Sequence, residues 1–120
     1  MRRARLYADD ALRVLWLSQG RQELALSDAG VWLRSGRRQR DLPWAEIEQV
    51  QVRKLAFPGG SLAWVDLFTA TEDHRVGLFP AGVATSWVEA CATAAAAAGH
   101  VPLPLDGASG FALTVEARAS

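Results

Sequence analysis

The sequence predicts a mainly β fold, a barrel or split barrel of about seven strands capped by one C-terminal α-helix. Short apolar or alternating runs separated by turn residues fill the first two-thirds of the chain, and the hydrophobic period then changes to that of a helix. A length of 120 residues, half of them hydrophobic, suits one globular domain over residues 1–120. Residues 1–10 are left open as an ordered or a flexible segment, and residues 106–120 form a C-terminal extension that could hold an extra strand.

Seven segments are predicted to be strands because each is apolar or alternating and is bounded by turn residues. In chain order they are Ala11–Leu17, Gln22–Leu26, Val31–Arg34, Gln39–Leu42, Ile47–Phe57, Leu62–Thr69 and His74–Phe79. The second and third should form a hairpin across Ser27–Gly30, and the last two should form one across Thr71–Asp73. Pro43 cannot donate to a ladder, which keeps its segment out of a central position.

One helix is predicted from about Thr85 to Ala98. Ser86 and Glu89 have the spacing of a capping box, and Gly99 is a suitable residue just beyond the C-terminus. The residues expected on the buried helix face are Trp87, Cys91, Ala94, Ala95 and Ala98.

The stretch from Glu23 to Leu103 resembles a bacterial pleckstrin-homology-like (PH-like) domain. The resemblance rests on Ser-Asp-Ala-Gly-Val-Trp-Leu at 27–33 and Leu-Pro-Trp-Ala-Glu-Ile-Glu-Gln-Val at 42–50, followed by two strands around an acidic turn and a closing helix. It implies a PH-like barrel that binds membrane lipids, protein partners or its own copies. PH-like domains that bind phosphoinositides use basic residues of the first hairpins, whose counterpart here is the segment Arg34–Arg40.

The predicted binding residues belong to one turn and the strand before it. They are Trp32, Arg34, Arg37, Arg38 and Arg40. Guanidinium groups bind phosphate or carboxylate oxygens in pairs, so such a turn could hold an anionic headgroup. The alternative is an ordinary solvated hairpin turn. Trp32 lies on the strand face opposite Val31 and Leu33, which suits an interface or a lipid surface. The alternative is packing under the terminal helix or the N-terminal segment.

The other four tryptophans are expected in the core, since each can bury a large area. They are Trp16, Trp44, Trp64 and Trp87.

The formal net charge is zero, which argues against a dedicated nucleic-acid binder. That total conceals an asymmetry. Residues 1–40 contain nine arginines and four acids, whereas residues 41–120 contain four basic residues and nine acids. The molecule could therefore be dipolar, if folding keeps the two sets apart.

No catalytic, metal or cofactor pattern is found, and we expect the protein not to be an enzyme. The histidines, His74 and His100, and the single Cys91 lack the spacing of zinc ligands. Cys91 is expected to be a small buried hydrophobe. Glu46 and Glu48 have no neighbour that would tune them for acid–base work, so a structural role is expected.

The expected location is cytoplasmic. The N-terminus has no apolar signal-peptide region, no run of roughly 18 apolar residues occurs, and one cysteine forms no internal disulfide. Arginine outnumbers lysine twelve to one, which is typical of a bacterial protein from a GC-rich genome.

The predicted function is a non-catalytic binding or self-association module whose ligand is unknown. One alternative is a peripheral module that contacts anionic membranes through the arginine-rich turn. A second is a small-ligand carrier or enzyme using the barrel interior, which would need a partly polar cavity. Homo-oligomerisation could accompany any of these through the apolar strand Phe111–Val115, if it is unpaired. Otherwise that strand could pair with Ala11–Leu17 inside the domain.

Overall fold

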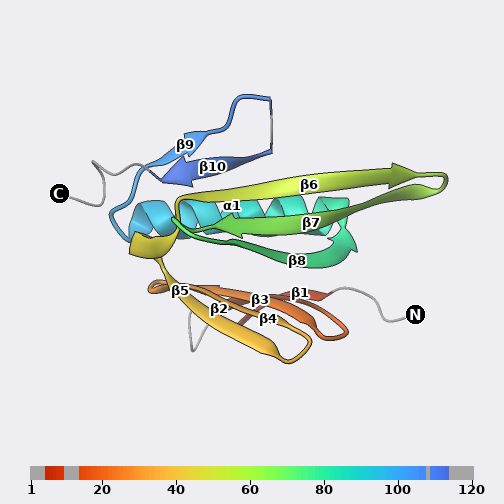
Figure 1. Ribbon diagram of the computed structural model, residues 1–120, viewed down its shortest axis with the longest axis horizontal. Helices are drawn as coiled ribbons and strands as arrows, with labels where there is room; N and C mark the ends of the chain where they lie inside the picture. The colour runs from red at the N-terminus through yellow and green to blue at the C-terminus, as the bar shows by residue number, and fades with distance from the viewer. Residues whose placement is uncertain (1–4, 10–13, 108, 114–120) are drawn as a thin grey trace.

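The computed structural model describes residues 5–9, 14–107 and 109–113. It is mainly β, with two five-stranded antiparallel sheets and one C-terminal helix (Figure 1). Among the described residues, no ladder joins the two sheets into a closed barrel. The strand orders are β1-β2-β3-β4-β5 in the first sheet, called sheet A, and β8-β7-β6-β10-β9 in the second, called sheet B.

Sheet A is a succession of antiparallel neighbours in chain order. Its strands are β1 (Arg5–Asp9), β2 (Val14–Gln19), β3 (Gln22–Ser27), β4 (Gly30–Ser35) and β5 (Arg38–Pro43). A short 3-10 helix, η1 (Trp44–Glu46), then leads to sheet B. The Trp44 indole Nε1 donates to the carbonyl of Asp28 at 3.0 Å, which ties η1 to the β3–β4 turn.

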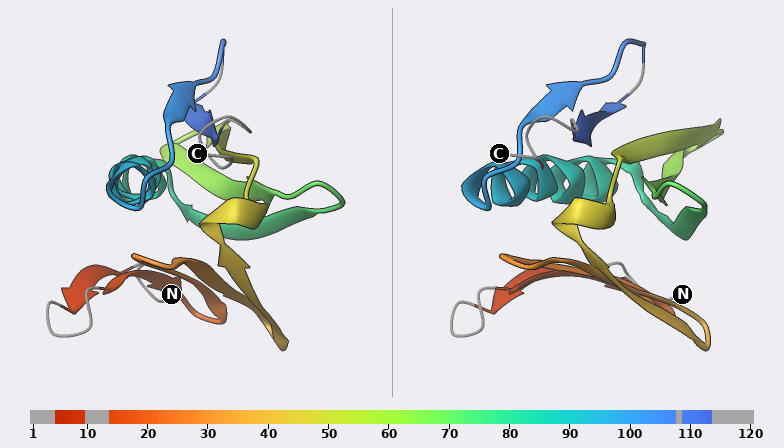
Figure 2. Two further views of the ribbon diagram at one scale, coloured as in Figure 1. Left: turned by 90° about the vertical axis from the view of Figure 1, so that its left-hand side faces the viewer. Right: turned by 60° about the vertical axis from the view of Figure 1, so that its left-hand side comes forward.

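Sheet B and the helix complete the fold. The sheet's strands are β6 (Gln49–Phe57), β7 (Gly60–Phe68), β8 (Asp73–Pro80), β9 (Pro102–Pro104) and β10 (Ser109–Leu113). The helix α1 (Ala81–Ala97) follows β8 directly and contacts strands of both sheets. Figure 2 shows α1 lying along the sheet B side, above sheet A.

The core fills the space between the two sheets and α1. Alternate residues of β3, β4, β6 and β7 point into it, as the strand period requires. Its largest fully buried apolar side chains are Trp87, Phe79, Leu17, Leu24, Ile47 and Leu67. All of these side chains are apolar, so the interior holds the fold together by hydrophobic burial.

The helix begins earlier than predicted. It starts at Ala81, with Pro80 as N-cap and no side-chain capping bond, so the predicted capping box is wrong: Ser86 lies inside the helix. Pro80 has the fixed φ that suits the residues at a helix start. The predicted end is confirmed. Gly99 has φ 95°, and the amides of Gly99 and His100 donate to Ala96 and Ala95 in a Schellman motif.

All seven predicted strands overlap strands β2 to β8, and both predicted hairpins are confirmed. Strands β1 and β9 were not predicted. The sequence left open whether residues 1–10 are ordered, and Arg5–Asp9 forms a strand that pairs with β2. Trp44 and Trp87 are buried as predicted. Trp64 is only half-buried, on the face of β7 away from the core. The side chain of Trp16 lies outside the part of the chain described.

The C-terminal strand does not present the unpaired edge proposed for oligomerisation. In β10, Phe111 pairs with Val50 of β6 on one side and with Pro104 of β9 on the other. In the described part of the chain, β10 lies between β6 and β9, whereas β2 belongs to sheet A. Gly110 makes the approach to β6 possible, because its φ is 141° and a Cβ there would overlap the carbonyl oxygen of Val50. Thr114 and Val115 lie outside the described residues.

Candidate binding surface

Two hairpin turns of sheet A lie side by side and carry exposed arginines. The amide of Gly36, in the β4–β5 turn, donates to the carbonyl of Arg21, in the β2–β3 turn, at 3.1 Å. Arg21, Arg37 and Arg38 are all exposed there. We call these three arginines the basic end. Both turns point toward the right-hand end of Figure 1.

Trp32 and Arg34 lie on a different surface, the outer face of sheet A. Their neighbours Val31 and Leu33 point into the core, so the alternation of the strand turns Trp32 and Arg34 away from it. Arg34 forms an ion pair with Glu23 of β3 and is partly buried. Trp32 is half-buried and lines an open groove of about 540 Å³. Both side chains therefore already have intramolecular neighbours.

Arg40 lies two residues beyond Arg38 on the same side of β5, toward the other end of that strand. It lines an open groove of about 700 Å³ between β5, η1 and the β7–β8 turn. The acids of this groove are Asp41, Glu46, Glu48 and Glu72, which we call the acidic end. Of the five predicted site residues, Arg37 and Arg38 belong to the basic end, which also contains Arg21. Trp32 and Arg34 share the outer face of sheet A, and Arg40 follows Arg38 on the same side of β5.

The basic end and the acids Glu46, Glu48 and Glu72 lie beyond opposite ends of β5, and Asp41 lies between them on that strand. Within sheet A, the β3–β4 turn is at the end opposite the basic end. The hydrogen bond from Trp44 to Asp28 holds η1 against that β3–β4 turn. The amide of Glu48 donates to Phe68 at the end of β7, which places the β7–β8 turn at the same end. Figure 1 shows η1 and the β7–β8 turn toward the left. Three of the nine arginines of residues 1–40 thus lie at the basic end, away from the acids of η1 and the β7–β8 turn.

The helix macrodipole has the same direction as this separation. Pro80 pairs with Leu62 near the β6–β7 turn, so α1 begins at the end of the molecule that carries the basic residues and runs back from it (Figure 1). Along α1, which is described over its whole length, the first turn has no acid and the last turn has no base. The helix adds partial positive charge to the basic end and partial negative charge opposite.

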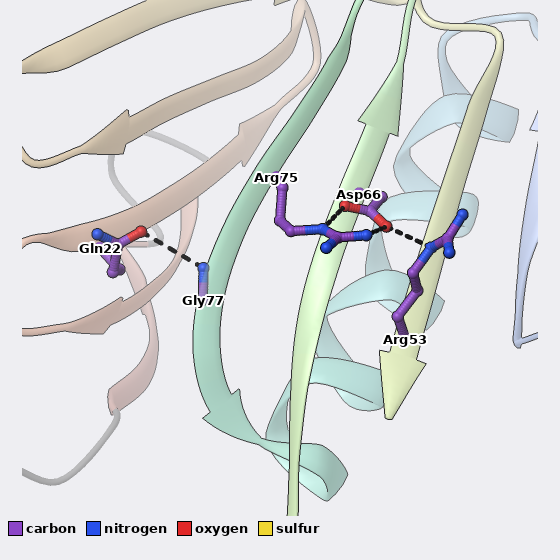
Figure 3. A network of polar contacts seen from close by, with 5 residues as sticks. All are labelled: Gln22, Arg53, Asp66, Arg75 and Gly77. Carbon is purple, nitrogen blue, oxygen red and sulfur yellow. Dashed lines mark hydrogen bonds and ion pairs between the residues drawn. The ribbon is translucent and has the colours of Figure 1, made fainter. Parts of the chain in front are cut away.

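A buried carboxylate organises the outer face of sheet B (Figure 3). Asp66 of β7 is 0% exposed. Arg75 of β8 binds it with Nε at 2.8 Å and Nη2 at 3.2 Å, and Arg53 of β6 reaches it with Nε at 2.7 Å. The guanidinium of Arg75 also lies 5.0 Å from the ring centroid of Trp64. A charge this deeply buried is tolerable only because both partners compensate it.

This network was not predicted from the sequence. Its signal was a single acid, Asp66, within the otherwise apolar strand Leu62–Thr69. Counting the register back from the tight turn at Thr71–Asp73 would have placed Arg75 opposite it. Figure 3 also shows the Gly77 amide donating to Gln22 Oε1 at 3.4 Å, a polar link between sheets B and A.

Asp73 extends the network and gives it a pH dependence. Burial raises the pKa of Asp73 above 3.8, and the nearby Asp66 raises it further, against the opposing effect of Arg75 and Arg53. In the interval between 3.8 and the folded-state pKa, the folded protein binds more protons than the unfolded chain. The free energy of unfolding therefore falls as pH rises through that interval.

Asp73→Asn is accordingly expected to be more stable than wild type at pH 7. The difference should vanish near pH 3, where Asp73 is protonated in both the folded and unfolded states. Urea unfolding of both proteins at the two pH values measures it, with Asp41→Asn in sheet A as a control for removing one exposed acid. An Asp73→Asn protein less stable than wild type at pH 7 would contradict the direction of the pKa shift.

The remaining chemically active side chains do not form a site in the described part of the chain. No group of three His, Cys, Asp or Glu residues there could hold a metal ion. Cys91 is fully buried on α1, as predicted, and burial raises the pKa of its thiol. His74 Nε2 lies 3.5 Å from Glu72 Oε2 at the acidic end.

Comparisons of the chain with protein-family models, with curated proteins and with solved structures found no match. Within the described residues, no helix is both long and apolar enough to cross a bilayer. The assignment of a function therefore depends on the surface just described.

Proposed function

We propose that this chain is a non-catalytic binding module of PH-like fold that docks its basic end on an anionic partner in the cytoplasm. The order of the elements supports the PH-like assignment: strands β2 to β5 in one antiparallel sheet, β6 to β8 in a second, and then α1. Strands β1, β9 and β10 are additions to that core.

The observation that carries the proposed function is the separation of charge. Arg21, Arg37 and Arg38 come from two turns whose backbones are held side by side by a main-chain hydrogen bond, so the three exposed side chains start from one end of sheet A. The acids of η1 and the β7–β8 turn lie at the other end, where they repel an anion least. A protein of zero formal net charge would thus still orient toward an anionic surface.

The alternative of a small-ligand carrier has less support. The interior between the sheets and α1 is filled by apolar side chains among the described residues, and the described grooves open on the outer surface. A carrier needs an enclosed space with a few convergent polar groups. Self-association through the C-terminal strand also loses support, because Phe111 is paired on both sides.

Retention on heparin-agarose, a polyanionic matrix, tests the proposed function. Wild type at pH 7 should be retained and should elute with salt, because exposed charges are screened over about 8–10 Å at physiological ionic strength. Arg37→Ala/Arg38→Ala should elute at clearly lower salt or in the flow-through. The fold of each variant is checked by its thermal melting curve.

A charge-matched variant separates a local surface from overall charge. Adding Glu46→Gln/Glu48→Gln to the double arginine variant returns the formal net charge to zero. If the basic end is the binding surface, the fourfold variant still fails to bind. Recovery of binding would mean that net charge alone governs retention, and the proposed function would be wrong.

A further inference from the structure

We propose that the tip of the β6–β7 hairpin inserts into the interfacial region of an anionic lipid bilayer while the basic residues around it contact the headgroups. This proposal rests on the proposed function, because it identifies the anionic partner as a lipid surface. It assigns a role to residues 54–62, which the sequence predicted only to be the ends of two strands and the turn between them.

The hairpin extends beyond the rest of sheet B. Strands β6 and β7 pair continuously from Gln49 with Phe68 to Phe57 with Gly60. Within the described residues, pairing with β10 on the β6 side extends to Val52, and pairing with β8 on the β7 side extends to Leu62. The distal part of the hairpin is therefore a free two-stranded ribbon, as Figure 1 shows at the right-hand end of the molecule.

Apolar groups are exposed on this ribbon. Leu55 is 44% exposed, one of three large hydrophobic residues exposed among those described. Ala56 and Pro58 are also exposed, and Leu62, which pairs with Leu55, is half-buried. Residues 54–62 contain no acid. A projecting, acid-free apolar tip is costly in water and is stabilised by transfer into the boundary between headgroups and acyl chains.

Basic residues stand directly behind the tip, where the headgroups would be. The side chain of Arg53 is 51% exposed although its Nε pairs with Asp66, and Lys54 is exposed. Because they are consecutive in a strand, they point to opposite faces of the ribbon and flank it on both sides. Cations in this position are attracted by anionic lipids. Lys54, together with the basic end, therefore favours an anionic bilayer as the occupant.

The rest of the molecule would present the tip in the correct orientation. The hairpin points toward the same end as the β2–β3 and β4–β5 turns (Figures 1 and 2). The N-terminus of α1 lies beside Leu62, and the acidic end faces away. An anionic membrane would therefore attract the end that carries the hairpin and repel the opposite end. A second copy of the chain would instead have to bring its acidic end to this tip.

A fluorescent probe at Leu55 tests insertion directly. In Leu55→Cys, the native Cys91 is fully buried, so an environment-sensitive thiol dye labels the introduced cysteine of the folded protein. With vesicles of phosphatidylcholine and phosphatidylglycerol, the emission should shift to the blue and should be quenched by brominated acyl chains. The same dye on Glu46→Cys, at the acidic end, should show neither change.

A matched pair of leucines tests the energetic contribution. Leu55→Ser should bind these vesicles about 10-fold more weakly, because burying a leucine side chain is worth a factor of that order. Leu103→Ser is the control, since Leu103 on β9 is also 44% exposed but lies away from the tip. Its vesicle affinity should equal that of wild type.

The possible outcomes separate this proposal from the proposed function. Sedimentation with anionic vesicles while the dye at Leu55 stays in water would overturn insertion but leave anionic docking intact. Retention on heparin-agarose without vesicle binding would overturn the lipid assignment and point to an anionic macromolecule. A loss of light-scattering mass in Leu55→Ser would show that the tip instead joins two copies of the chain.

Discussion

Removing both arginines that hold Asp66, in the variant Arg53→Met/Arg75→Met, is expected to lower the free energy of unfolding by about 3–5 kcal/mol. Methionine keeps most of each aliphatic stem over the carboxylate, so Asp66 would stay buried without a cation. An uncompensated buried charge is among the largest single destabilising effects known in folded proteins. Urea unfolding followed by tryptophan fluorescence would measure the loss.

Two further variants give this prediction its controls. Adding Asp66→Asn to the double variant should recover much of the loss, because the buried charge is then gone. Arg38→Met/Arg40→Met removes two exposed arginines from β5 and should change stability by less than about 0.5 kcal/mol per site. A double variant at Arg53 and Arg75 that unfolds like this control would mean that Asp66 does not need its partners.

Trp87→Ala is expected to lower the free energy of unfolding by about 3–5 kcal/mol. Trp87 is fully buried, and it projects from α1, the helix that contacts strands of both sheets. Its removal would leave a cavity where α1 and the two sheets meet, and the surrounding strands are held by their own ladders and cannot collapse into it. Thermal and urea unfolding would both report the change.

Trp87→Phe should be less damaging, since it keeps an aromatic ring in the site. Trp64→Ala should also cost less, because Trp64 is only half-buried on the outer face of sheet B. If Trp64→Ala proved more destabilising than Trp87→Ala, the stacking of Arg75 on Trp64 would matter more than the core contact of α1.

Most of the fold could be predicted because its signals are local. Alternation and turn residues located strands β2 to β8, and Gly99 marked the end of the helix. The predicted start of the helix was wrong because Ser86 and Glu89 have the spacing of a capping box. The helix in fact begins after Pro80, with no side-chain capping bond. Strand β9 was missed because Pro102 and Pro104 disfavour a strand everywhere except at an edge.

The candidate surface could be predicted from the sequence only in part. Arg34, Arg38 and Arg40 are close in sequence, yet pairing places Arg34 on the outer face of sheet A and Arg40 beside the acidic end. Arg21 lies beside the β4–β5 turn because β3 and β4 pair antiparallel, with Gln22 opposite Ser35. The predicted hairpin of these two strands implied that proximity, so Arg21 could have been included among the predicted binding residues.

The edges of sheet B restrict how a partner can be recognised. Two of the three residues in β9 are prolines, which have no amide hydrogen to offer an incoming strand, and β8 at the opposite edge lies against β3 and β4. Extension of this sheet by a peptide backbone is therefore disfavoured at both margins. Partners meeting sheet B must be distinguished by its side chains, so specificity there should change readily with single substitutions while the backbone scaffold stays constant.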